Sequence, residues 1–273
     1  MKKPAQFKLW LSLFLCLSLS GVTLPAAFAA DSADKKEILK RAHAAYYNAK
    51  TQGLTEFKAN VTPNWRIVLK DQLAANPAGA EKALQMLNGI HFTVSLDPQG
   101  DIKVTHRADV APSNETSAKG FEQIFTGMEQ TMSGFFDTWK PFMFASPFPE
   151  VDSEYQLVEK ENQYYLSYKE GATDVATTMS KDFVISELKV TTAGFKSILK
   201  PRFKPNPQGL LMTGYTATYQ GATAADTVQL QVEIDYQEAG GVQLPRSLNL
   251  SGAFQGTPFA IEMAFSNYDV KKH

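Results

Sequence analysis

The stretch VQLQVEIDY, residues 228–236, decides the fold, because its side chains alternate strictly between apolar and polar. Every second residue from Val228 to Tyr236 is apolar, and glutamine, glutamate or aspartate stands between them. Successive side chains of a β-strand point to opposite faces of a sheet, so the alternation predicts a strand with one buried face and one wet face. The stretch PFAIEMAFS, residues 258–266, repeats the pattern. The strands are therefore expected to form an antiparallel sheet.

Strand patterns continue from Tyr155 to the C-terminus, and we count roughly ten strands in all, with about four helices toward the N-terminal side. A flat sheet of ten strands would span roughly 45 Å, which three or four helices about 10 Å wide cannot cover. A twisted sheet of this width is expected to curl around its helices. We therefore predict an α+β fold in which a strongly curved antiparallel β-sheet, a half-barrel, has helices covering its concave face. Pro245 marks an edge or a bulge within it.

The segment HFTVSLDPQGDIKVTHR, residues 91–107, predicts a hairpin whose register follows from its turn. A turn at residues 97–100, with the glycine at positive φ, sets Phe92 opposite His106. His91 and His106 then lie on opposite faces of the sheet and cannot share a metal ion. Zinc needs three or four protein ligands, and the sequence offers no histidine or thiolate cluster, so we predict no metal and no cofactor.

Apolar residues also recur at helical spacing in several segments: residues 34–50, 63–73 and 77–87. A longer helix is expected from about Gly120 to Trp139, with its large apolar side chains on one face. It is predicted to end before Pro141. The basic, proline-rich segment KPRFKPNPQG, residues 200–209, is interpreted as a solvated loop, with contact to a partner or to anionic lipid as the alternative.

The end of the long helix is unusually aromatic, since residues 133–150 hold five phenylalanines, one tryptophan and one methionine. The helical aromatic residues either pack the core or line a cavity. Beyond the helix, prolines predict an irregular segment whose apolar side chains either fold back into the core or form a lid over a ligand. Trp65 has the same two alternatives, and Arg66 is either solvated or holds a carboxylate or phosphate head group. The candidate ligand-binding residues are Trp65, Arg66, Phe135, Phe136, Trp139, Phe142, Met143, Phe144 and Phe148.

The first 29 residues predict a cleaved secretory signal peptide. They hold three lysines, a short apolar run at residues 9–19 and a small-x-small site that ends at Ala29. The run is shorter than the roughly 20 residues of a membrane span, so we expect no stable membrane insertion. Cys16, the single cysteine, lies inside it. Cleavage would leave residues 30–273 in the periplasm or outside the cell, with three fewer positive charges than the full chain, whose formal charge is −1. This acidic balance argues against binding to nucleic acid.

Two segments near the ends of the predicted mature chain carry a family resemblance: GLTEFKANV, residues 53–61, and GTPFAIEMAFSNYDV, residues 256–270. Together with the signal peptide and the N-terminal helix, they resemble the LolA-like periplasmic lipoprotein carriers and their lipid-binding relatives. The resemblance implies one half-barrel domain over residues 30–273, lidded by helices, that carries a lipid, an acylated protein or another hydrophobic ligand. A membrane-associated donor or acceptor protein is the partner it implies. The alternative is a periplasmic sensor or assembly factor that binds a protein partner without lipid transport.

Catalytic motifs give no support to an enzyme. The sequence holds four histidines, and it has no nucleophile elbow, phosphate-binding loop or dinucleotide fingerprint. We therefore predict that the protein is not an enzyme.

Overall fold

A computed structural model describes residues 32–109, 115–221, 227–254 and 256–273, so the predicted signal peptide lies outside the described residues. Within these ranges the helices are α1 (Ser32–Ala44), α2 (Trp65–Val68), α3 (Lys70–Ala75), α4 (Pro77–Asn88) and α5 (Glu115–Met143). The strands are β1 (Leu54–Pro63), β2 (Ile90–Leu96), β3 (Ile102–Ala108), β4 (Tyr155–Lys160), β5 (Gln163–Glu170), β6 (Thr173–Ser180), β7 (Ile185–Thr192), β8 (Phe195–Asn206), β9 (Gly209–Gln220), β10 (Thr227–Ala239), β11 (Val242–Phe254) and β12 (Thr257–Lys272).

The described strands form one antiparallel sheet in the order β3-β2-β1-β12-β11-β10-β9-β8-β7-β6-β5-β4, which is not closed into a barrel. The α+β prediction is confirmed, but the count of roughly ten strands is wrong, because the sheet has twelve. The chain reverses in very short turns that leave little polar sequence between strands. Positive φ at Glu161 and Asn162 joins β4 to β5, and Gly240 and Gly241 join β10 to β11 in the same way.

The predicted β2–β3 hairpin is confirmed in register and in turn geometry. Phe92 lies opposite His106, and Leu96 lies opposite Ile102. Gly100 has a φ of 86°, which an L side chain rarely adopts. The residues of the turn at 97–100 were therefore sufficient to predict which side chains of the hairpin share a face.

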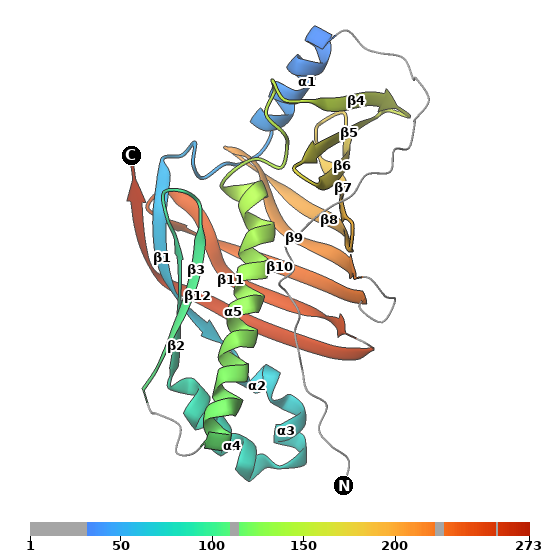
Figure 1. The fold of residues 1–273 in the computed structure, drawn as a ribbon. Coiled ribbons are helices and arrows are strands. Elements are labelled where there is room, and N and C mark those ends of the chain that lie inside the picture. Colours follow the sequence, from blue (N-terminus) through green and yellow to red (C-terminus); the bar gives the residue numbers. More distant parts are fainter. Residues whose placement is uncertain (1–31, 110–114, 222–226, 255) are drawn as a thin grey trace.

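Helix α5 lies across one face of the sheet, which we call the inner face (Figure 1). It runs through Pro141 to Met143, so the expectation that it ends before Pro141 is wrong. Proline removes one backbone donor, but the last turn is held by the amides of Phe144 and Ala145, both 2.9 Å from the Lys140 carbonyl oxygen. Burial of Phe142 and Met143 stabilises the same turn.

Helix α1 ends at Ala44 rather than at residue 50, because the backbone after it hydrogen-bonds to strand β9. The amide of Leu210 donates to Ala45, and the amide of Tyr47 donates to Leu210. This close approach requires Gly209, where an added Cβ would lie 2.6 Å from the carbonyl carbon of Tyr46. A tertiary contact therefore overrides the helical pattern of residues 45–50.

The segment at residues 200–209, interpreted as a loop, lies mostly in strand β8. Its prolines fit because β8 pairs with β7 only as far as Leu199, while it continues to pair with β9. Pro201 and Pro205 lie beyond the last residue that pairs with β7, so β7 needs no backbone donor from either of them. Pro245, predicted at an edge or bulge, stands where the β10–β11 register shifts.

Candidate functional site

Two transverse rows of side chains cross the inner face from β4 toward β12 and form the floor of the candidate site. Directly paired residues share a face, so each row follows from the strand register. The first, the Thr177 row, consists of Leu157, Leu166, Thr177, Leu188, Leu199, Ala217, Leu230, Gly252 and Phe259. The second, the Ser197 row, consists of Tyr155, Tyr168, Val175, Val190, Ser197, Tyr219 and Val228.

Burial is uneven along these rows. The buried apolar members are Leu157, Leu166, Val175, Leu199 and Ala217. Other members are only partly covered: Leu188, Val190, Tyr219, Val228, Leu230 and Phe259. Sheet side chains on a covered face are normally buried, so partly exposed ones mark places that the helices do not seal. Two such places lie on either side of the buried β8 members Leu199 and Ser197, one on β7 and one on β9, β10 and β12. These residues are the exposed apolar floor of the site.

One side of helix α5 seals the neighbouring part of the inner face. The indole of Trp139 donates to the hydroxyl of Tyr236 on β10 at 3.2 Å. The rings of Phe135 and Phe136 lie 6.4 and 5.9 Å from that of Phe265 on β12. The helix is thus anchored over β10 and β12 by large aromatic side chains.

The flank of α5 that turns toward β9 carries small residues: Gly127, Thr131, Gly134 and Thr138. The hydroxyls of Thr131 and Thr138 donate to the carbonyl oxygens four residues earlier, at 2.7 and 3.1 Å. An added Cβ at Gly127 would meet no atom within 4 Å. The flank therefore has free space beside it and presents methyl groups instead of unpaired polar atoms.

Tyrosines fix the orientation of this flank. Burial raises the pKa of the Tyr215 and Tyr219 hydroxyls, and a hydrogen bond with Thr138 partly offsets the rise in both. Thr138 thus lies against β9. Tyr219 is partly exposed and its hydroxyl is hydrogen-bonded to Thr138, so this side chain can meet a ligand while its polar tip already has a partner.

The nine ligand-binding residues predicted from the sequence lie outside the exposed apolar floor. Arg66 is exposed and pairs with Glu81 at 3.1 Å. The other eight are buried in the core: Trp65, Phe135, Phe136, Trp139, Phe142, Met143, Phe144 and Phe148. The alternative of core packing describes these contacts, and their role as ligand contacts stays a prediction that would require α5 to move.

Phe142 and Met143 are helical, which corrects their assignment to an irregular segment; Phe144 and Phe148 follow the helix as expected. Sequence reasoning missed the exposed floor residues Tyr219, Leu230 and Phe259. Strand alternation did place Leu230 and Phe259 on the buried face. The missing information was which part of that face the helix leaves open.

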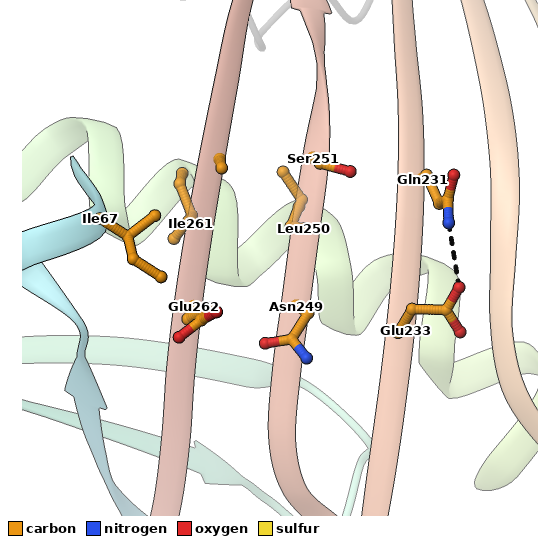
Figure 2. A pocket seen from close by; sticks show the side chains of 9 residues that line it. Ile67, Gln231, Glu233, Asn249, Leu250, Ser251, Ile261 and Glu262 are labelled. Carbon is orange, nitrogen blue, oxygen red and sulfur yellow. Dashed lines mark hydrogen bonds between the residues drawn. The ribbon is translucent and has the colours of Figure 1, made fainter. Parts of the chain in front are cut away.

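A surface depression of about 150 Å³ lies on the outer face of β10–β12, with α5 behind the strands (Figure 2). Its polar lining is already engaged: Glu233 pairs with Arg202 at 2.6 Å, and Glu262 accepts from Asn64 at 3.0 Å. Ligand pockets usually measure roughly 300–1,000 Å³. This depression is therefore smaller than a usual ligand pocket, and the carboxylates in its lining already have partners.

The histidines of the β2–β3 hairpin lie on opposite faces, as predicted. His91 contacts Asp109 at 2.7 Å, and this hydrogen bond lowers the pKa of the aspartate. His106 contacts Glu129 of α5 at 2.7 Å and stacks on Phe125. In the part of the chain that the structure describes, no three histidine, cysteine, aspartate or glutamate side chains gather as a metal site.

One serine–histidine contact was not foreseen from the sequence. The ring nitrogens of His43 lie 2.9 Å from the Pro149 carbonyl oxygen and 2.7 Å from the Ser146 hydroxyl. A carbonyl can only accept, so Nε2 carries a proton, and in the neutral ring Nδ1 accepts from the Ser146 hydroxyl. The serine oxygen also accepts from the Phe148 amide at 3.3 Å. These bonds tie α1 to the segment after α5.

Comparison with known proteins gives no relative: no family model, no curated protein and no solved structure matches this chain. Among the described helices, none combines the length and apolar character that crossing a membrane requires.

Proposed function

We propose that this protein is a periplasmic carrier or binding protein for a lipid, an acylated protein or another hydrophobic ligand. The ligand lies on the concave inner face of a half-barrel, between the exposed apolar floor and the small-residue flank of α5. A membrane-associated protein would donate or accept the ligand. The secretory signal pattern of the sequence supports the location.

The observation that carries the proposal is the coincidence of a half-covered apolar floor with free space beside the helix above it. Leu230 and Phe259 are partly exposed on the floor. Gly127 has no atom near its Cβ position, on the flank of the same helix whose Thr138 contacts β9. Binding sites for hydrophobic ligands are concave and mostly apolar, with few polar groups.

The size of the floor fits a useful affinity. Complete burial of a leucine or phenylalanine side chain contributes about 1.5–3 kcal/mol. Covering the exposed parts of the six floor side chains, two leucines, two valines, a phenylalanine and a tyrosine, would contribute about a few kcal/mol from the protein side, and the ligand buries a similar apolar area. A micromolar dissociation constant corresponds to about 8 kcal/mol, so acyl chains are within reach of this surface.

The test is titration of the secreted, delipidated protein with N-phenyl-1-naphthylamine, a dye whose fluorescence rises in apolar surroundings. Leu230→Asp places a charge on the floor, and its matched control, Gln229→Asp, places the same charge on the outer face of the same strand. Gly127→Trp fills the free space, with Thr126→Trp on an exposed part of the helix as its control.

We expect both test variants to lose most dye binding and both controls to keep it, with circular dichroism confirming that all four are folded. Native mass spectrometry of protein purified without detergent should show adducts that solvent extraction removes. Dye binding that is absent from the unaltered protein, or equal in all four variants, contradicts the proposal.

A further inference from the structure

We propose that the ligand carries an uncharged, hydrogen-bonding head group, such as the glycerol ester of a monoacylglycerol, and that Thr177 receives this group. The inference rests on the proposed function and specifies the ligand class for the same site. It is carried by a polar group that the protein leaves without a partner on an otherwise apolar surface.

Thr177 is 2% exposed, and its Oγ1 has no hydrogen-bond partner. A buried hydroxyl without a partner costs roughly 1–3 kcal/mol, and valine would fit the same β-strand position at no such cost. The side chain lies on the inner face, between Leu166 and Leu188 of the Thr177 row. Its neighbour in the row, Leu188 on the adjacent strand about 5 Å away, is partly exposed, so a small shift of that side chain would open a path to the buried hydroxyl.

A second polar side chain lies nearby on the same face. Ser197 is 8% exposed and belongs to the adjacent row, two strands from Thr177. Together they are the buried polar side chains of the described core. The two side chains are two strand spacings apart, roughly 10 Å, so Ser197 adds a second polar point on the same face beyond the reach of a head group bound directly to Thr177.

The charge of the site selects against ionic head groups. The members of the two rows are apolar, tyrosine, threonine, serine or glycine. Several cations near the β4–β7 end of the sheet have contacts of their own: Lys181 pairs with Glu159 and lies 4.1 Å from the Tyr164 ring centroid, Lys36 pairs with Asp152, and Arg41 lies 5.1 Å from the Phe183 ring centroid. A phosphate placed among these rows would lose its hydration without a paired cation, which is strongly unfavourable.

The test compares three probes with the same long chain: 1-oleoylglycerol, anionic oleoyl-lysophosphatidylglycerol and 1-octadecene, which has no polar head. Full-length secreted protein is used, with the variant Thr177→Val, which is nearly isosteric and removes only the hydroxyl. Thr178→Val is the matched control, since this neighbour lies on the opposite face of β6. Binding is measured by displacement of N-phenyl-1-naphthylamine.

We expect the unaltered protein to bind 1-oleoylglycerol at least tenfold more tightly than either other probe. Thr177→Val should weaken 1-oleoylglycerol five- to tenfold and leave 1-octadecene unchanged, while Thr178→Val changes neither. Equal effects of the two variants, or equally tight binding of the anionic probe, would overturn the inference while leaving hydrophobic binding intact. Failure of the unaltered protein to bind the dye and all three probes would refute the proposed function itself.

Discussion

Replacing Gly127 with alanine is expected to stabilise the protein, and the structure supplies the magnitude. Gly127 is inside α5, and an added Cβ would meet no heavy atom within 4 Å. No packing penalty therefore offsets the helix preference for alanine over glycine, which is about 0.5–1 kcal/mol. In a protein of this size, each kcal/mol shifts the melting temperature by roughly 2–4 °C. The expected rise is thus about 1–4 °C.

Thermal unfolding followed by circular dichroism measures this rise, with Gly214→Ala as the comparison. At Gly214 an added Cβ would overlap the carbonyl oxygen of Val232, so that variant should melt well below the unaltered protein. A melting temperature for Gly127→Ala that stays the same or falls would refute the reasoning. It would mean that the flank of α5 is packed against other atoms and that no space is free for a ligand.

Three further outcomes follow from the core. Tyr46→Phe should cost about 1–3 kcal/mol of unfolding free energy in urea titration, because its hydroxyl bridges two backbone groups at 2.7 and 2.9 Å; an unchanged midpoint would show that water replaces it. Phe136→Ala should cost about 3–5 kcal/mol, whereas Arg66→Ala should change stability by less than about 1 kcal/mol, and similar losses in both would contradict the assigned packing. Burial raises the pKa of Tyr168 to about 12, above the value of about 10 in the unfolded chain. The stability that the neutral hydroxyl contributes to the folded protein is therefore present below pH 10 and is lost between about pH 10 and 12. Unfolding at constant temperature across this pH range measures the loss, and a stability that does not fall there would contradict the prediction.

The glycines of α5 are informative because they disfavour the helix that holds them. Gly120, Gly127 and Gly134 each cost roughly 1 kcal/mol relative to alanine in a helix interior. Neither Gly120 nor Gly127 is required by close packing, since an added Cβ has open space at both. For Gly127, which belongs to the small-residue flank, space for a ligand is a physical reason for its presence.

Local sequence was sufficient wherever neighbours along the chain determine the structure. Strict alternation in residues 228–236 and 258–266 identified antiparallel strands with one buried face, since the period of two is a property of the strand itself. The turn before Asp101 fixed the β2–β3 register, because a glycine at positive φ allows one geometry. The aromatic face of α5 could also be recognised from its spacing.

Tertiary contacts decided the rest. The end of α1 depends on Leu210, which is more than 160 positions away in sequence, and the continuation of α5 through Pro141 depends on burial of Phe142 and Met143. The candidate site also depends on tertiary contacts, because the exposure of a side chain is set by all the elements that pack over it. The sequence determined that Leu230 and Phe259 face inward, but only the path of α5 across the sheet decided that their surface stays open, whereas the surface beneath Trp139 is sealed.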